Sequence, residues 1–317
     1  MLTFNKSKDS LLIAEIPNKN KDDKLLIYYK PDPDGDLENE IDADTDQKLS
    51  LFSKYIEGDN KLSFEDIKSL KLAFKTNSTT HIPQKLTRKY EDAVRYVENS
   101  LKTYLDFEKD KLVFPIITDP SYRLFLSGLS GSGKSTVIAS FLKTNRPKKK
   151  GAGIFLFSPI SDDPSLKSIK NLIQQSIHEI ETNLEREIEV EDFPDGSVVI
   201  FDDIESIKKP FHTKYMELRD TLLERGRSHK EGELGISTIC VSHNAMNGHS
   251  TKTSIRECQY WVLFPSSNKR DVKTLLKTYG GLETQKIDDV MNIKSRWIFF
   301  KKSVPQYVIA EHSILLI

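Results

Sequence analysis

The stretch Gly128-Leu129-Ser130-Gly131-Ser132-Gly133-Lys134-Ser135 determines how the rest of this chain is interpreted. It fits the pattern G-x-x-x-x-G-K-[ST], in which glycines let successive backbone N–H groups curl around phosphate oxygens. The apolar run at 123–126 predicts a buried strand before it, and the apolar spacing over 135–142 predicts a helix after it. A glycine turn between a strand and a helix start is the setting that phosphate binding requires.

This motif assigns specific roles to its side chains. We expect Lys134 to reach the β- and γ-phosphates of ATP and the Ser135 hydroxyl to ligate Mg²⁺. ATP and Mg²⁺ are therefore the predicted cofactors. The residues expected to contact the nucleotide are Gly128, Leu129, Ser130, Gly131, Ser132, Gly133, Lys134, Ser135 and Thr136.

A second motif follows at 197–205, where four apolar residues end in the acids Asp202, Asp203 and, two residues on, Glu205. Such a run predicts a buried strand with carboxylates at its carboxyl end, the edge of a parallel sheet at which ligands bind. Asp202 is placed to hold Mg²⁺, and either Asp203 or Glu205 to act as general base toward water. The alternative is that these acids only cap the next helix.

Two further segments carry polar candidates. Arg225 and Arg227 end a predicted helix, and in oligomeric ATPases an arginine of a neighbouring subunit completes the site. Surface charge is the other interpretation of both. His243 follows a predicted strand over 236–242 and is either a sensor of the γ-phosphate or a structural histidine.

Composition excludes several classes of protein. The chain has 317 residues, 37% of them hydrophobic, and a formal net charge of zero, so no global basic field predicts nucleic-acid binding. Cys240 and Cys258 lie in apolar stretches and predict reduced core thiols. No stretch is long enough for a transmembrane helix, and the N-terminus lacks the apolar region of a signal peptide. We expect a reducing, cytoplasm-like setting.

The pattern along the chain predicts two domains. From 111 to 317 strands and helices alternate, which is typical of an α/β fold with a mostly parallel sheet. Residues 1–110 predict an α+β accessory region, with a hairpin over 11–29 and helices at about 63–74 and 87–107. The acidic segment 32–46 between them predicts a solvated loop, because it departs from a calcium-binding loop at two essential positions.

The second domain carries further predicted elements. The basic turn at 146–151 is either solvated surface or a contact for a phosphate backbone. Pro164 opens a region with a long helical pattern that runs through Leu172, Ile173, Ile177, Ile180 and Leu184. A fifth strand is predicted at 260–264. A helix over 268–278 follows, and the strand-like runs 296–300 and 307–310 predict a C-terminal β-hairpin.

Taken together, these motifs resemble one family in their order and spacing. It is the DNA-packaging ATPase family of large double-stranded DNA viruses, the poxvirus-like branch of the FtsK/HerA P-loop ATPases. The resemblance covers 115–317 and rests on the P-loop, 198–203, 223–229, 238–244, 260–264 and the C-terminal strands. It implies a RecA-like core in a homo-oligomeric ring that moves double-stranded DNA into a capsid. A capsid or portal partner, and a location in the virion or in a cytoplasmic virus factory, are also implied.

This chain departs from the family at two positions. Asp203 stands where many members carry glutamate, which leaves the base open between Asp203 and Glu205. His243 stands where a glutamine sensor is common. Two other functions remain: an AAA+ remodelling ATPase, which would carry an all-helical lid after the fifth strand, and an assembly protein that binds ATP with little turnover.

Overall fold

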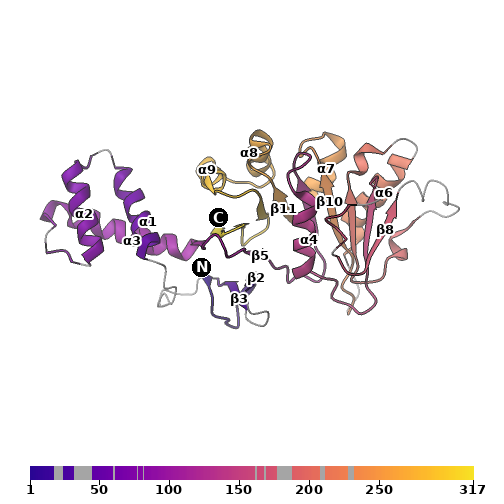
Figure 1. Ribbon diagram of the computed structural model, residues 1–317, viewed down its shortest axis with the longest axis horizontal. Helices are drawn as coiled ribbons and strands as arrows, with labels where there is room; N and C mark the ends of the chain where they lie inside the picture. Colours follow the sequence, from indigo (N-terminus) through magenta and orange to yellow (C-terminus); the bar gives the residue numbers. More distant parts are fainter. Residues whose placement is uncertain are drawn as a thin grey trace. The chain divides into compact units, whose positions relative to one another are not determined.

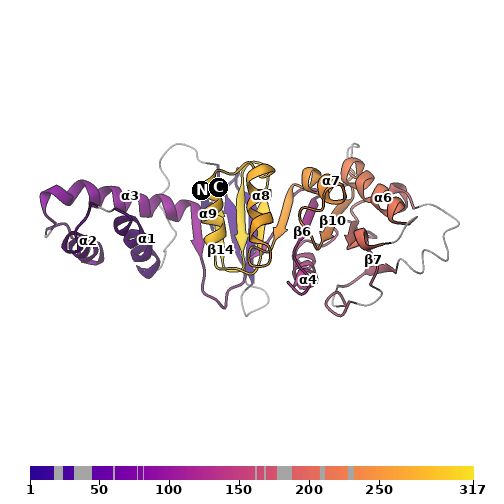
Figure 2. The same cartoon turned by 90° about the horizontal axis from the view of Figure 1, so that it is seen from above.

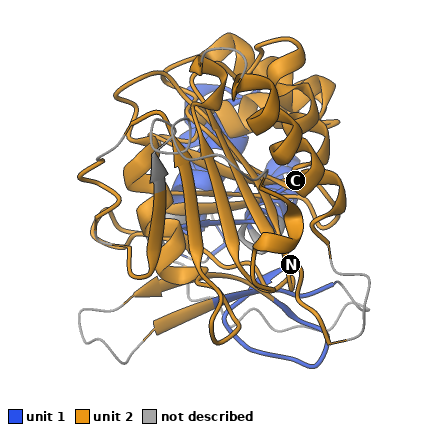
Figure 3. Ribbon diagram, turned by 90° about the vertical axis from the view of Figure 1, so that its right-hand side faces the viewer, with its two compact units in different colours: residues 1–11, 27–106, 316 blue, residues 12–26, 107–315, 317 orange. Residues whose placement is uncertain are grey.

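The computed structural model divides the chain into two compact units, which are shown in Figure 3. Unit 1 comprises residues 1–11, 27–106 and 316, and unit 2 comprises residues 12–26, 107–315 and 317. The structure describes residues 1–17, 24–31, 45–59, 61–76, 78–80, 82–160, 163–167, 169–176, 188–207, 211–227 and 232–317. Within this described part, no helix combines the length and apolar character that crossing a bilayer requires.

Unit 1 is built on helices α1 (Thr45–Glu57), α2 (Phe64–Thr76) and α3 (Thr87–Thr103), with a short helix η1 (Gln84–Leu86) and strand β1 (Leu2–Thr3). Their apolar faces share one core, in which Phe52 stacks on Phe74 with ring centroids 4.1 Å apart. The two predicted helices are confirmed. The second ends earlier than predicted, because residues 104–106 form strand β4 (Tyr104–Asp106).

The predicted N-terminal hairpin corresponds to β2 (Leu11–Pro17) and β3 (Lys24–Tyr29), which are neighbours in a small antiparallel sheet. In this sheet β3 pairs with β1, and β2 pairs with β5 (Phe114–Pro115). The acidic segment lies almost wholly outside the described residues, so its predicted loop stays a prediction.

The large sheet of unit 2 holds the candidate site. Its strand order is β14-β13-β12-β11-β6-β10-β9-β7-β8. Five pairings in its centre are parallel, whereas β12 pairs antiparallel with both β11 and β13. The strands are β6 (Arg123–Ser127), β7 (Ile154–Ser158), β8 (Leu172–Ser176), β9 (Val198–Asp202), β10 (Ser237–Ser242), β11 (Tyr260–Leu263), β12 (Ile298–Lys301), β13 (Tyr307–Ala310) and β14 (Ser313–Leu316). The predicted α/β class, the mostly parallel sheet and the C-terminal hairpin are confirmed.

Helices cover both faces of this sheet, as Figure 2 shows. Successive side chains of a strand point to opposite faces, so Phe299 and Phe300 enter different layers. The ring centroid of Phe299 lies 6.2 Å from that of Phe141 in α4 (Lys134–Thr144). Phe300 instead joins the core that contains residues of α8 (Lys269–Thr278) and α9 (Thr284–Asn292). On that second face also pack α6 (Phe211–Arg225) and α7 (His249–Glu257). Short helices η2 (Val190–Asp192) and η3 (Ile204–Ser206) flank β9.

One predicted element is wrong. The helical pattern predicted in the region that Pro164 opens includes Leu172 and Ile173, but residues 172–176 form strand β8, which pairs in parallel with β7. A short apolar run does not distinguish a strand from a helix by periodicity, and here pairing with β7 decides the outcome. Ile173 lies on this outer strand with 46% of its surface exposed, so the apolar residues of this segment do not mark a buried helix face. The remainder of the predicted helix, 177–187, lies outside the described residues.

Candidate nucleotide site at the carboxyl edge of the sheet

The register of four strands brings the motifs to one edge. Ser127 at the end of β6 is paired with Ser242 of β10 and with Leu263 of β11, and Val241 is paired with Asp202 of β9. The segments that leave these strands therefore emerge side by side. The P-loop, the acids after β9 and His243 after β10 form one cluster, as their sequence positions predicted.

The P-loop has a backbone that requires its glycines. Gly131 and Gly133 have φ of 76° and 96°, in the left-handed region that side chains with a Cβ disfavour. Gly128 is needed for space, because a Cβ there would lie 2.6 Å from Cδ2 of Phe264 and 2.7 Å from Oγ of Ser132. Gly133 caps α4, so the N-terminal N–H groups of that helix face the loop. The loop is thus shaped as an anion cradle.

Lys134 lies at the centre of the cluster with only 9% of its surface exposed. Its ammonium donates to the carbonyl oxygens of Gly128 at 2.8 Å and Leu129 at 3.2 Å, and lies 3.0 Å from Nδ1 of His243. Burial lowers the pKa of Lys134, against the opposing charges of Asp202 and Asp203. The Lys134 ammonium is therefore held between the carbonyl oxygens of the P-loop and the histidine that follows β10.

Asp202 and Asp203 point to different partners. Asp202 accepts a hydrogen bond from the hydroxyl of Ser158 at 3.4 Å. Burial raises its pKa, and the like charge of Asp203 raises it further. Asp203 has a φ of 52°, unusual for a residue with a Cβ, and its Oδ2 lies 3.3 Å from Nε2 of His243. His243 therefore links the Asp203 carboxylate to the Lys134 ammonium.

Glu205 lies away from this chain of contacts. It hydrogen-bonds Ser242, and its Oε1 lies 4.0 Å from Nη1 of Arg219. Burial raises its pKa to about 7, although the charge of Arg219 opposes the shift. The two candidate bases thus have distinct surroundings: Asp203 contacts the histidine beside the P-loop, and Glu205 contacts a buried arginine.

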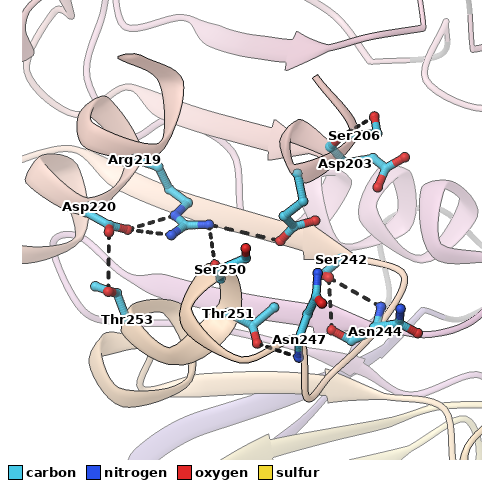
Figure 4. Close-up of polar contacts among 11 residues, drawn as sticks. Asp203, Ser206, Arg219, Asp220, Ser242, Asn244, Asn247, Ser250, Thr251 and Thr253 are labelled. Atoms are coloured by element: carbon cyan, nitrogen blue, oxygen red, sulfur yellow. Dashed lines mark hydrogen bonds and ion pairs between the residues drawn. The ribbon is translucent and has the colours of Figure 1, made fainter. Parts of the chain in front are cut away.

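Arg219 was missed by the sequence analysis. It is 1% exposed and donates to Oδ1 of Asp220 at 2.8 and 2.6 Å and to the carbonyl of Ser250 at 2.8 Å. Figure 4 shows this fork reaching from α6 to α7, where Thr253 donates to the same Asp220 carboxylate. The signal was present, since Arg219 lies four residues after Tyr215 and three before Leu222, within the apolar stripe of the helix.

Asp163 is a second residue that the sequence analysis did not single out. Burial would raise the pKa of its carboxyl group, but hydrogen bonds from Ser135 and Ser165 lower it overall. A carboxylate therefore contacts the P-loop hydroxyl from the segment after β7. Of the remaining predicted nucleotide contacts, Leu129 and Ser130 in the loop and Thr136 in α4 are exposed.

Arg225 and Arg227 lie at the opposite edge of the sheet. Both are exposed, and the carbonyl of Gly226 between them accepts a 2.7 Å hydrogen bond from Ile236, which directly precedes β10. His243 follows the other end of that six-residue strand, about 20 Å away. The structure does not bring these arginines to the P-loop of their own chain. Residues 228–230 of the same motif lie outside the described residues.

The basic turn at 146–151 is also on that opposite edge, between α4 and β7. Lys148 donates to the carbonyls of Thr118 and Asp119 at 3.1 and 2.6 Å. Lys149 pairs with Asp195 at 2.8 Å. Lys148 and Lys149 therefore have partners within the chain, which favours the interpretation of this turn as solvated surface.

The raised pKa of Glu205 predicts a measurable pH dependence. Its folded value of about 7 lies above its ordinary value of 4.5, so the folded protein holds this proton more tightly than the unfolded chain. The stabilisation is complete below pH 4.5 and is lost as pH rises through 7. Relative to a Glu205→Gln variant, wild-type unfolding free energy should fall by on the order of 2 kcal/mol between about pH 5 and pH 8.

Urea denaturation of both proteins at several pH values measures this difference. Asp202 titrates in both proteins, so its contribution cancels in the comparison. Parallel stability profiles for wild type and Glu205→Gln would contradict the assignment.

Comparison with solved structures gives distant matches. The genome packaging NTPase B204 from Sulfolobus turreted icosahedral virus 2, in complex with AMPPCP, has a TM-score of 0.37 and 13% identity, covering 61% of this chain and 98% of B204. The pCW3 conjugation coupling protein TcpA, with ATPγS, has a TM-score of 0.39 and 13% identity, covering 66% of each chain. Similarity at this level does not assign a function.

Comparison of sequences gives a nearer relative. No protein-family model matches the chain. The uncharacterized protein V3 of Sputnik virophage is 32% identical over 232 residues, which span 67% of this chain and 88% of V3. The chain therefore belongs to the viral family that includes protein V3 of Sputnik virophage, in agreement with the viral P-loop family that its motifs predicted.

Proposed function

We propose that this protein is a Mg²⁺-dependent ATPase that moves double-stranded viral DNA into a capsid. The observation that carries the proposal is the cluster of Lys134, Asp202, Asp203 and His243 beside the P-loop. In it, Lys134 Nζ lies 3.0 Å from His243 Nδ1, and His243 Nε2 lies 3.3 Å from Asp203 Oδ2. A cation at a phosphate cradle, next to two carboxylates, is the arrangement that phosphoryl transfer to water requires.

The oxygen atoms of the site fit Mg²⁺. This ion takes one or two protein oxygens and completes its shell with phosphates and water. The Ser135 hydroxyl and the Asp202 carboxylate would supply such oxygens. Burial and then the like charge of Asp203 raise the pKa of Asp202, and a bound cation would offset both effects. Among the residues that the structure describes, no group of three or more His, Cys, Asp or Glu side chains could cage a metal alone. When bound, the ion would neutralise charge on the phosphates.

We assign the other steps of ATP hydrolysis to four side chains of this chain. Lys134 exchanges its carbonyl partners for the β- and γ-phosphates, which are stronger charge-assisted acceptors. We assign the general base to Asp203, which accepts the proton of the attacking water, and an orienting role to His243. Glu205 is held by Arg219 and Ser242, and we assign it a positioning role. We also propose that His243 responds to the γ-phosphate, which its contacts with both Lys134 and Asp203 support.

The DNA and assembly parts of the proposal rest on the resemblance of the whole motif set and on the viral relative. We propose a homo-oligomeric ring in which Arg225 or Arg227 acts on the nucleotide of a neighbouring subunit, since both lie far from their own P-loop. A capsid or portal protein would hold the ring, either in the virion or in a virus factory. An AAA+ enzyme is disfavoured, because strands β12 to β14 return to the sheet after α8 and α9.

Steady-state ATP hydrolysis, measured with and without long double-stranded DNA at low and moderate salt, tests the proposal. We expect Mg²⁺-dependent turnover that DNA stimulates and that salt weakens, because phosphate contacts release counterions. Tight ATP binding without turnover under all conditions would favour a nucleotide-binding assembly protein instead. Turnover that ignores DNA would favour a remodelling ATPase.

The same assay tests the arginines. Arg225→Ala or Arg227→Ala should lose turnover and keep ATP binding if either acts across the subunit interface. Mixing that variant with Asp202→Ala subunits should then restore part of the activity, because some interfaces would pair an intact arginine with an intact site. Absence of rescue at every mixing ratio argues against a shared site.

A further inference from the structure

An apolar cavity of about 160 Å³ lies beside the P-loop helix in unit 2. One wall is α4, through Thr136, Val137, Ser140 and Phe141. The other walls come from distant parts of the chain: the segment 112–115, Val262 of β11, and Arg296, Trp297 and Glu311. Figure 1 shows α4 standing beside β11 and β5, the elements that close the cavity. Nothing in the phosphate chemistry described above uses this space.

The register places the cavity at the same edge of the sheet as the P-loop. Leu263 of β11 pairs with Ser127 on one side and with Ile298 on the other. Trp297, which precedes β12, and Gly128, which follows β6, therefore lie at the same edge of the sheet. Strand β11 lies between β12 and β6, so two strand spacings separate the two residues. Two strand spacings are about 10 Å, a distance that a ribose and one phosphate can bridge. Val137 lies only about 4.5 Å along the helix axis from Lys134.

The walls are held firmly, so the cavity is a built feature. The N–H of Val113 donates to the carbonyl of Glu311 at 2.9 Å. Glu311 is only 7% exposed, and its carboxylate accepts from the backbone N–H of Arg296 at 2.9 Å and from its Nε at 2.7 Å. At the far end, the Asn145 side chain donates to the Pro115 carbonyl at 2.8 Å, which ties α4 to β5.

The size and lining indicate the chemistry of the occupant. A cavity of about 150 Å³ in a protein core can hold a benzene ring, so 160 Å³ suits a flat aromatic group whose edge reaches the opening. Ligand sites are mostly apolar with a few polar groups that fix orientation. Here the half-buried Trp297 and Val137 supply apolar surface, and the hydroxyls of Thr136 and Ser140 supply polar atoms.

We propose that this cavity binds the adenine ring of the nucleotide whose phosphates occupy the P-loop. The inference rests on the proposed function and extends it, since it assigns base recognition to Trp297, Val137 and Ser140. The C-terminal strands thereby acquire a role in the site, because Trp297 directly precedes β12. In this proposal the loop binds the triphosphate, and the base lies in a pocket whose walls come from five separate parts of the chain.

Equilibrium binding of ATP and of inorganic tripolyphosphate, measured by titration calorimetry, tests the assignment. Ser140→Trp fills the cavity and should weaken ATP binding at least about tenfold while changing tripolyphosphate binding by less than about twofold. Trp297→Ala removes aromatic surface and should weaken ATP binding about tenfold, as loss of one base-stacking contact does. Lys143→Trp, an exposed change on the same helix outside the cavity, should leave both affinities unchanged.

The outcomes separate the two levels of the argument. If ATP binds Ser140→Trp and Trp297→Ala as tightly as wild type, the base lies elsewhere and the adenine assignment is wrong, although the P-loop proposal stands. If neither ATP nor tripolyphosphate binds the wild-type protein, the proposed function itself fails. If Ser140→Trp does not fold, Trp297→Ala and its conservative partner Trp297→Phe, which should restore ATP affinity, still decide the question.

Discussion

Lys134→Ala should lower ATP turnover by at least about a thousandfold without unfolding the protein. In the proposed function the lysine supplies the positive charge nearest the bridging and terminal phosphates, and removal of one such preorganised charge typically costs about two to three orders of magnitude or more. Its ammonium contacts carbonyls of the loop and His243 rather than core side chains. Burial lowers its pKa, so the folded protein gains little from keeping it charged.

Coupled-assay kinetics and a thermal melt of the same samples measure both halves of this prediction. Lys143→Ala is the matched control, since Lys143 is exposed on the same helix and lies outside the cluster. Turnover in Lys134→Ala comparable to wild type would remove the basis for the proposed activity. A collapse of its melting temperature would instead assign Lys134 a structural role.

Arg219→Met should lower the free energy of unfolding by about 2–3 kcal/mol, because a buried hydrogen-bonded cation is lost and its acceptors are left without their donor. The Arg219 side chain is 2% exposed, whereas Asp220 keeps 34% of its side chain in contact with water, so the cost stays below that of breaking a fully buried ion pair. The change strands the Asp220 carboxylate, leaves the carbonyl of Ser250 without its donor, and removes the cation that opposes the raised pKa of Glu205. The methionine retains the apolar length of the side chain, so the cavity contribution stays small.

Urea denaturation monitored by circular dichroism measures the loss. Arg225→Met, an exposed change near the end of the same helix, should shift stability by less than about 0.5 kcal/mol. Adding Glu205→Gln to Arg219→Met should recover part of the loss, because the buried Glu205 carboxylate, which also loses the nearby cation, is then replaced by a neutral amide. A cost below about 1 kcal/mol for Arg219→Met would mean that water or rearrangement satisfies these groups.

The sequence was sufficient to predict those parts of the site that depend on strand ends. Buried apolar runs identify β6, β9 and β10, and parallel pairing requires that the residues after them meet at one edge. The approach of Asp203 and His243 follows from that rule, although their 3.3 Å separation does not. The positive φ angles of Gly131 and Gly133 agree with the glycine spacing, interpreted together with the strand before it and the helix after it.

The remainder depends on tertiary contacts that no local pattern contains. Arg219 occupies a position in an apolar stripe, and only packing against α7 reveals its partners. The cavity near Trp297 is assembled from segments more than a hundred residues apart. Strand β8 was misassigned because its pairing with β7, rather than its own periodicity, determines its conformation.

The geometry of α6 has a mechanical consequence. This helix holds Arg219 at its middle and Arg225 at its end, about 9 Å further along a stiff rod. Any tilt of the rod that loosens Arg219 from Glu205 must also displace the exposed arginine end, by roughly 1.5 Å for each ten degrees of rotation. A rotation of α6 would therefore couple the position of Arg219 beside Glu205 to the position of Arg225 at the opposite edge of the sheet.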